Sequence, residues 1–243
     1  MTLTKKELKK EFFRRVPKAR PWSPVHQSWF EFMYAAHLLA KPGTRLLNIY
    51  ASWDFSGNRE EVYREKFFSA CDYESLDFGE DKFIYPAKKE GDGRHVIPFP
   101  DKHFDVIVTT KYIMEHISEP ERVVQELYRV LKPGGEVFVV AAHVRRQHQK
   151  PYDFFRFTEF GLEHLFKKAG FRELAITASN GWAVTLTSYA YFFERSIPMP
   201  RFLERFFDGV YYYLVEPIGF FLDQFDNGYG RDLSLYYLIR AKR

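Results

Sequence analysis

The chain of 243 residues contains a single cysteine, Cys71. One cysteine excludes an internal disulfide framework and is typical of a reducing compartment. No stretch approaches the ~20 apolar residues of a membrane-spanning helix, and the most apolar one, residues 209–222, is interrupted by Glu216 and Pro217. The first twenty residues are charged throughout, so we expect no secretory signal. The sequence therefore predicts a cytoplasmic protein.

Glycine is scarce in the segment where a nucleotide-binding α/β domain needs it. Residues 46–58, LLNIYASWDFSGN, predict a buried strand that leaves the sheet through a loop and enters a helix. Glycines at such a loop let the backbone approach a cofactor. Here Tyr50, Trp53 and Phe55 occupy the loop, and its only glycine is Gly57. The chain has no Gly-x-Gly-x-x-Gly, which disfavours a nicotinamide-dependent dehydrogenase.

Composition and charge indicate a folded domain without a nucleic-acid partner. Hydrophobic residues make up 46% and charged residues 28% of the chain, which is typical of globular proteins. The net charge of +4 is uneven, because residues 1–20 hold eight Lys or Arg and two acids. A basic leading helix could contact an acidic membrane surface or nucleic acid. A solvated helix face is the simpler interpretation, since no groove-reading motif accompanies the charges.

Apolar periodicity predicts two helices, at 4–15 and 27–40, and then a buried strand at 45–50. Asn58 and Glu61 have the spacing of a capping box, so the next helix should start near Asn58. A second strand is expected around 73–78, and a short third strand before residue 97.

The middle of the chain predicts a βαβ unit. Residues 104–110, FDVIVTT, form a β-branched run expected of a strand covered on both faces. Ser118 is expected to cap the following helix, with Glu121 completing the box. The turn KPGG at 132–135 ends that helix, and a strand follows at 136–142. Strand, helix, glycine turn and strand indicate a parallel sheet.

A helical insertion is predicted late in the chain. Thr158 caps a helix that Gly170 ends. Strands near 173–179 and 233–243 then bracket residues 180–232, which are too many for an ordinary connection. The aromatic residues of 189–213 could form a lid, a dimer face or an interfacial membrane contact. Packing onto the sheet is expected to account for most of them.

Four segments together resemble the class I S-adenosylmethionine-dependent methyltransferases of the small-molecule "type 11" group. They are Ile-Pro-Phe at 97–99, Phe-Asp at 104–105, Glu-His at 115–116 and Arg-Val-Leu-Lys-Pro-Gly-Gly at 129–135. Residues 148–171 are similar to a subgroup that carries a His, Pro-Tyr-Asp and Arg-x-Thr. The resemblance covers about residues 44–180.

The resemblance implies a Rossmann-like α/β fold, with a seven-stranded, mostly parallel sheet, helices on both faces and an antiparallel last strand. Residues 1–43 would be N-terminal helices packing on the core. Residues 44–243 would form the methyltransferase-like domain, with the aromatic insertion at about 180–232. S-adenosylmethionine would lie across the carboxyl ends of the first strands.

The resemblance also implies where the cofactor binds. The family pattern places an acid two residues before Gly-x-Gly-x-Gly. Here Asn48 replaces the acid, and residues with side chains replace the glycines. Those side chains should block the cofactor or force a different loop path. Asp77 matches the acid that holds the ribose hydroxyls, although it could instead cap a nearby amide. Asp92 and Gly93 match the positions that meet the adenine amine, and Thr110 and Lys111 match those that line the methionine end. The expected cofactor-binding residues are Asn48, Tyr50, Ser52, Gly57, Asp77, Asp92, Gly93, Thr110 and Lys111.

His148 is the candidate general base, because an imidazole can remove a proton from a hydroxyl or amine at neutral pH. Its alternative is a hydrogen bond that ties the loop to Tyr152 or Asp153. Asp153 and Arg156 are expected to form a structural ion pair. Glu115 and His116 are expected to shape the sheet edge. No metal site is expected from the histidines at 143 and 148, since no acid or cysteine stands at ligand spacing.

Two functions follow. The first is a methyltransferase that uses S-adenosylmethionine on a small-molecule or glycan-like acceptor, at O or N. The second is a catalytically inactive protein of the same fold that acts as a binding or partner subunit, its cavity partly filled by Tyr50, Trp53 or Phe55. The insertion could support a homodimer or a peripheral membrane contact.

Overall fold

The computed structural model describes residues 3–16, 19–50, 60–77, 96–110, 112–194 and 196–243. Several expectations lie outside these residues: the cap at Asn58 and the short third strand before residue 97. The same is true of five expected cofactor contacts, which are Ser52, Gly57, Asp92, Gly93 and Lys111.

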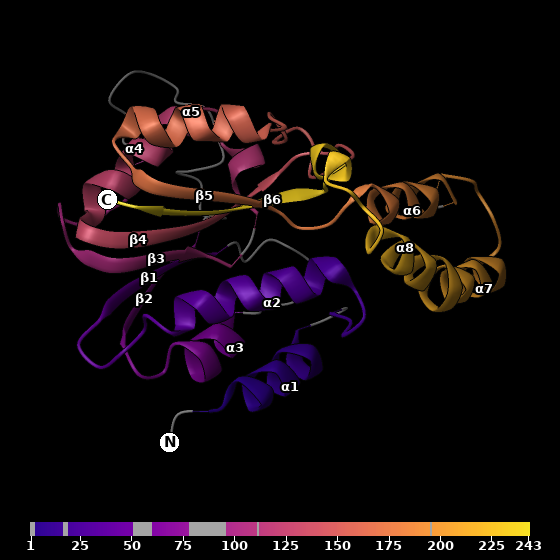
Figure 1. Ribbon diagram of the computed structural model, residues 1–243, viewed down its shortest axis with the longest axis horizontal. Helices are drawn as coiled ribbons and strands as arrows, with labels where there is room; N and C mark the ends of the chain where they lie inside the picture. The colour runs from indigo at the N-terminus through magenta and orange to yellow at the C-terminus, as the bar shows by residue number, and fades with distance from the viewer. Residues whose placement is uncertain (1–2, 17–18, 51–59, 78–95, 111, 195) are drawn as a thin grey trace.

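A mixed sheet organises the fold (Figure 1). Its six strands among the described residues are β1 (Arg45–Tyr50), β2 (Asp72–Asp77), β3 (Phe104–Thr109), β4 (Leu131–Ala142), β5 (Arg172–Ala178) and β6 (Tyr236–Lys242). They lie in the order β2-β1-β3-β4-β6-β5. The first four strands pair in parallel, and β6 pairs antiparallel with both β4 and β5. The antiparallel last strand is therefore confirmed, whereas the described residues show six strands and not the expected seven.

Both faces of the sheet are buried, because alternate residues of each strand point to opposite sides. One face carries Leu46, Val106, Val108, Phe138, Val140 and Leu238. The other face carries Leu47, Ile49, Ile107, Val137, Val139 and Ile239. Helices cover both faces, which explains the continuous apolar runs of β3 and β4.

The N-terminal helices cover the first face (Figure 1). They are α1 (Lys5–Arg15), α2 (Pro24–His37) and the short α3 (Glu60–Val62), which continues as a π-helical turn, η1 (Tyr63–Phe67). A capping box between Thr4 and Glu7 begins α1. Its Phe12 packs against Phe30 of α2 and Phe67 of η1, so aromatic contacts join the helices.

Helices α4 (Pro120–Val130) and α5 (Glu159–Ala169) cover the second face. The expected cap of α4 is wrong: its N-cap residue is Glu119, one residue after Ser118, and that side chain makes no capping hydrogen bond. The expected ends of α5 are confirmed. Thr158 accepts a hydrogen bond from the Gly161 amide, and Gly170 has a left-handed φ of 105°.

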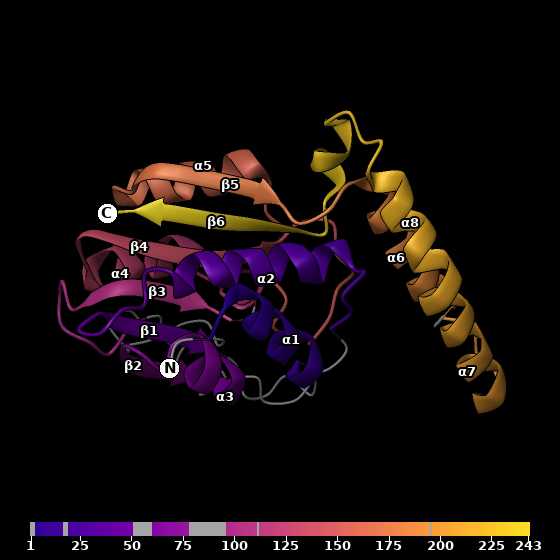
Figure 2. The same ribbon diagram turned by 60° about the horizontal axis from the view of Figure 1, so that its bottom comes forward.

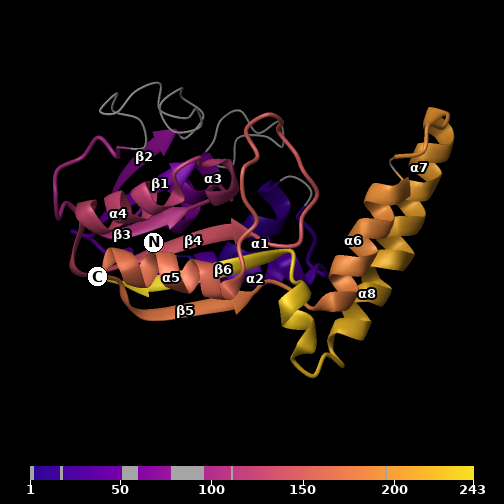
Figure 3. The ribbon, with the colours of Figure 1, turned by 90° about the horizontal axis from the view of Figure 1, so that it is seen from above.

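The insertion forms a helical arm, defined here as residues 182–223. It comprises α6 (Trp182–Glu194), α7 (Arg201–Val210), η3 (Tyr211–Val215) and α8 (Glu216–Asp223), and a 3₁₀ turn, η4 (Tyr229–Leu233), leads back to β6. Figures 2 and 3 show α6 lying beside α7 and α8 in a hairpin that extends away from the sheet. No helix among the described residues has the length and apolar character to cross a membrane.

Many large apolar side chains of the arm are exposed, so the expectation that most of them pack onto the sheet is wrong. The exposed set is Trp182, Leu186, Tyr189, Phe193, Ile197, Phe202, Leu203, Phe206, Phe207, Tyr213, Leu214, Ile218, Phe221 and Leu222. Within the hairpin, side chains are buried mainly where α6 contacts α8, because its two layers leave the outer faces uncovered.

Charged contacts attach the arm to the body. Arg20 lies 2.9 Å from Glu216 of α8, and the two side chains are 18% and 9% exposed. The Arg20 guanidinium also lies 3.5 Å from the Tyr212 ring centre. At the start of α6, Asp223 accepts hydrogen bonds from the backbone amides of Gly181 and Ala183.

Candidate active site

The described candidate residues meet at the carboxyl edge of the parallel strands. Tyr50 ends β1 and lies in register with Asp77, which ends β2. Thr110 follows β3, and His148 lies in the loop after β4. In open α/β sheets this edge is where ligands bind.

Asn48 and Thr110 are used inside the protein. Asn48 is fully buried in β1, and its amide donates a hydrogen bond to the Tyr73 hydroxyl of β2 at 2.8 Å. The Thr110 hydroxyl, after β3, donates to the Asn48 side-chain oxygen at 3.0 Å. This Asn48 network, defined as Asn48, Tyr73 and Thr110, links three neighbouring strands. Contact of Asn48 or Thr110 with a cofactor stays a prediction.

Asp77 and Tyr50 lie at the outer end of this edge. Both side chains are partly exposed. A carboxylate at the end of β2 accepts hydrogen bonds only, which suits a pair of hydroxyl groups. Tyr50 stands where the family pattern has its first glycine, and it is the backbone neighbour of Asp77 in the sheet.

A short helix after β3 positions an acid and a histidine. Glu115 and His116 belong to the 3₁₀ turn η2 (Met114–His116), and the backbone amide of Phe154 donates to the Glu115 carbonyl oxygen at 2.7 Å. Nδ1 of His116 donates to the carbonyl oxygen of Tyr152 at 2.5 Å. Two contacts therefore tie η2 to the loop after β4.

His148 is held by an internal clamp in that loop. Arg156 donates hydrogen bonds to both carboxylate oxygens of Asp153, at 2.6 and 2.8 Å, so the expected ion pair is confirmed. Asp153 also accepts from the backbone amide of His148 at 2.7 Å, which is one of the loop contacts expected for this position. The clamp fixes where the His148 ring lies.

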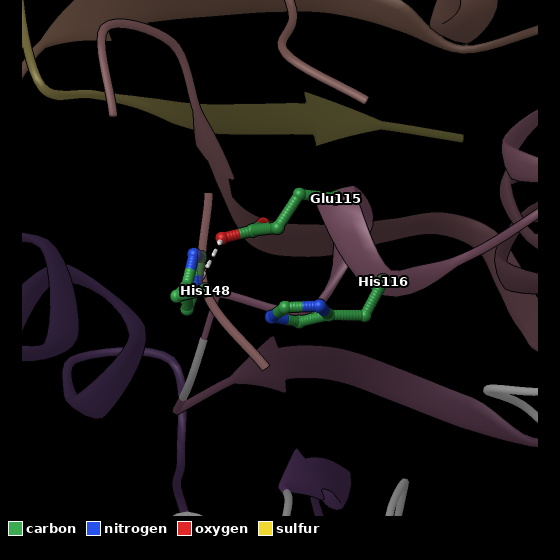
Figure 4. Close-up of side chains that lie close together, drawn as sticks. All are labelled: Glu115, His116 and His148. Atoms are coloured by element: carbon green, nitrogen blue, oxygen red, sulfur yellow. Dashed lines mark ion pairs between the residues drawn. The ribbon is translucent and has the colours of Figure 1, made fainter. Parts of the chain in front are cut away.

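The His148 ring faces Glu115 (Figure 4). Its Nε2 lies 3.8 Å from Glu115 Oε1, and its ring centre is 4.8 Å from that of His116. Glu115 is 0% exposed, and neither of its carboxylate oxygens has a hydrogen-bond partner among the described residues. We name Glu115, His116 and His148 the Glu-His-His cluster.

Burial perturbs the pKa values of this cluster. It raises the pKa of Glu115 to about 7, because an ionised carboxylate is poorly solvated inside the protein. It lowers the pKa of His148 to about 4, and the neighbouring His116 lowers it further in the same direction. His148 is therefore a neutral imidazole at pH 7.

Sequence reasoning missed the proximity of Glu115 to His148. It considered a metal site only at His143 and His148 and expected none; in the structure, Nε2 of His143 donates to the Asp232 carbonyl oxygen at 2.8 Å. The acid and the second histidine near His148 come from a segment about thirty residues earlier. The adjacent Glu-His pair after a buried strand is the only sequence signal that could have identified them.

A polar hollow with a volume of about 620 Å³ lies at the base of the arm. Asp223 and Asp226 line it, together with Arg231. Both acids accept hydrogen bonds from backbone amides of the arm and the loop after it. We therefore place the candidate chemistry at the Glu-His-His cluster.

A known family model matches part of the chain. Residues 54–139 match the family model described as "Methyltransferase domain". This match confirms the resemblance to class I S-adenosylmethionine-dependent methyltransferases that the segments at 97–135 indicate.

Curated relatives cover part of the chain. The ubiquinone/menaquinone biosynthesis C-methyltransferase UbiE of Vibrio vulnificus (strain YJ016) is 27% identical over 158 residues, which are 60% of this chain and 57% of the relative. A demethylmenaquinone methyltransferase of Streptomyces griseus is 31% identical over 107 residues, 43% of this chain and 45% of the relative. The chain spans about half the length of the curated relatives it matches.

Among solved structures, a SAM-dependent methyltransferase from Archaeoglobus fulgidus is 15% identical, with 86% of this chain and 90% of that chain covered and a TM-score of 0.49. Phosphoethanolamine N-methyltransferase 2 of Haemonchus contortus, in complex with S-adenosyl-L-methionine, is 15% identical, with coverage of 100% and 60% and a TM-score of 0.46.

Proposed function

We propose, from the methyltransferase-domain match of residues 54–139, that this chain transfers a methyl group from S-adenosylmethionine to a small-molecule or glycan-like acceptor. The observation that supports the proposal is that Asp77, at the end of β2, and the Glu115–His148 pair, in the segments after β3 and β4, lie along the same carboxyl edge of the sheet.

The described residues fit the cofactor at one end. Asp77 would hold the ribose hydroxyls, since it ends β2 at the sheet edge and its carboxylate accepts hydrogen bonds. S-adenosylmethionine supplies an activated methyl group on a sulfonium. Asn48 and Thr110 would support this edge from behind through the Asn48 network. Contacts from Ser52, Gly57, Asp92, Gly93 and Lys111 remain part of the proposal.

The acceptor would lie against His148. Because burial lowers its pKa to about 4, the imidazole is unprotonated at neutral pH but is a weaker base than a solvated histidine. The Glu115 carboxyl, 3.8 Å away and with a pKa of about 7, would take the proton that a hydroxyl or amine passes to His148. Alignment of the acceptor with the methyl carbon would supply most of the remaining rate enhancement.

The acceptor atom is the finer part of the proposal. We favour oxygen or nitrogen, because the acceptor faces a proton-accepting group. Two relatives are named as quinone-biosynthesis methyltransferases, one of them a C-methyltransferase. Loss of a hydroxyl proton also activates the neighbouring carbon of an aromatic ring. Product analysis by mass spectrometry with labelled methyl groups would separate these outcomes.

An inactive partner subunit is the second candidate. Tyr50 at the first glycine position and the internal use of Asn48 favour it. Calorimetry with S-adenosylmethionine and S-adenosylhomocysteine, in buffer containing EDTA, distinguishes the two. Micromolar affinity supports the enzyme, and no heat at high concentration contradicts it.

Paired variants sharpen this titration. Asp77→Asn should weaken binding about 10-fold or more, because hydrogen bonds to a charged acceptor contribute roughly 1.5–3 kcal/mol. Asp72→Asn is the matched control, since it changes an exposed aspartate at the other end of β2. Tyr50→Gly should bind more tightly if its ring obstructs the loop.

The arm would supply the protein's partner surface. We propose that it contacts a second copy of the chain or a membrane surface. We also propose that the protein is cytoplasmic and in part peripheral at the membrane. Phe202 and Phe206 are exposed on successive turns of α7. The double change of both to Glu should abolish either self-association in analytical ultracentrifugation or pelleting with anionic vesicles. Unchanged behaviour in both assays would contradict the proposal.

A further inference from the structure

The buried carboxylate of Glu115 lacks the partners that such a group needs. It is fully buried, and neither oxygen makes a hydrogen bond within the described part of the chain. A buried carboxylate without compensation is costly, and native proteins supply a hydrogen bond, an opposite charge or a metal ion. The charges of Arg145 and Arg156 act on Glu115, but neither side chain donates a hydrogen bond to it within the described part of the chain, and two histidine rings lie beside it. A bound cation would give this carboxylate the direct partner that it lacks.

The two histidines offer lone pairs toward Glu115. Because Nδ1 of His116 donates to the Tyr152 carbonyl oxygen, its proton is on Nδ1 and Nε2 carries a lone pair. Nδ1 of His148 donates to the Arg146 carbonyl oxygen at 3.3 Å, which leaves a lone pair on the Nε2 that faces Glu115. Figure 4 shows the carboxylate and both rings on the same side of η2.

We propose that Glu115, His116 and His148 bind a divalent transition-metal ion. One ligand atom from each side chain lies within 4.8 Å of the others. Metal–ligand distances of about 2.0–2.2 Å allow separations up to about 4.3 Å, so small side-chain rotations would close the set. Two imidazoles and one carboxylate, with coordination positions left open, suit Zn²⁺ or Fe²⁺.

The surroundings resemble the outer shell of a metal site. Ligating histidines donate their second ring N–H to a carbonyl or carboxylate, which sets the tautomer and the ring direction. Nδ1 of His116 donates to the Tyr152 carbonyl oxygen, and Nδ1 of His148 donates to the Arg146 carbonyl oxygen. Nδ1 of His148 also lies 3.4 Å from Oδ2 of Asp153. Arg156 in turn holds Asp153. These hydrogen bonds therefore set the tautomers of both rings and hold them close to coordinating positions before any ion binds.

If the chain has the proposed methyltransferase function, the metal would also change the role of His148. With Nε2 bound to the ion, His148 is a ligand and no longer the base. A hydroxyl of the acceptor bound at an open position would lose its proton to solvent water more easily, because the ion stabilises the resulting oxyanion. The class of acceptor would then be a hydroxyl compound.

Metal titration of the full-length chain tests the site. The protein is stripped with EDTA, dialysed and titrated with Zn²⁺ by calorimetry and with Co²⁺ by visible absorption, without S-adenosylmethionine. We expect one ion per chain, with nitrogen-ligand absorption bands for Co²⁺. Glu115→Gln and His148→Asn should each weaken binding at least 100-fold. The control His143→Asn, five residues before His148, should bind as the unchanged protein does.

Two results would overturn the metal site: no stoichiometric binding, or equal affinity in all three variants. If Glu115→Gln fails to fold, His148→Asn, in the loop after β4 and only partly buried, still decides the question. Failure here leaves the proposed function standing, since the cofactor titration is performed in EDTA. Cofactor binding without metal binding would restore His148 as the base.

Discussion

The Asn48 network offers a test of what the glycine-poor segment does. Asn48→Ala removes the amide that accepts from Thr110 and donates to Tyr73. If Asn48 supports the sheet from inside, the change should lower the stability of the whole domain. If it is instead a cofactor contact, the change should lower mainly the affinity for S-adenosylmethionine.

The structure sets the size of the effect. Asn48 and Thr110 are 0% and 1% exposed, so water cannot replace the lost hydrogen bonds. Each buried polar group left unpaired costs roughly 1–3 kcal/mol. The Tyr73 hydroxyl also interacts with Glu60 and loses one of its two partners. We expect unfolding to become easier by about 2–4 kcal/mol, or by roughly 4–16 °C in Tm for a domain of this size.

Urea unfolding followed by circular dichroism and by tryptophan fluorescence measures this change, provided both signals give one transition. Ser75→Ala is the matched control, because Ser75 lies opposite Asn48 in β2 but is exposed. It should shift stability by less than about 0.5 kcal/mol. A loss below 1 kcal/mol in Asn48→Ala, together with lost cofactor binding, would refute the reasoning.

Three further predictions concern other parts of the chain. Burial raises the pKa of Cys71 to about 11, so its alkylation by iodoacetamide should be slow at pH 8 and accelerate about tenfold per pH unit until pH 11; a plateau near pH 9 would contradict this. Gly219→Ala should loosen α6 from α8, because the new Cβ would lie 2.6 Å from a side-chain oxygen of α6, and limited proteolysis of the arm should become faster. The control Gly209→Ala should leave proteolysis unchanged, because no atom lies within 4 Å of its new Cβ. Arg20→Ala should cost about 3–5 kcal/mol by leaving Glu216 buried without its partner, and adding Glu216→Gln should recover part of that loss in urea unfolding.

Local patterns determined much of the fold. The bounds of β1, the Thr158 cap and the Gly170 end of α5 follow from short-range signals, and the structure has them as expected. The strand, helix and strand of residues 104–142 also follow from local periodicity and turn chemistry. Motif order over residues 97–135 indicated the resemblance to methyltransferases, and the match of residues 54–139 to a methyltransferase-domain model agrees with it.

Only the tertiary structure decided which side chains meet. Asn48 reads as a cofactor position in the sequence, and pairing of β1 with β2 and β3 makes it a partner of Tyr73 and Thr110. Glu115 and His148 are far apart in the chain and lie 3.8 Å apart because successive parallel strands deliver their loops to one edge. The arm's exposure is likewise a property of packing: apolar residues predict burial, but burial requires a surface close enough to cover them.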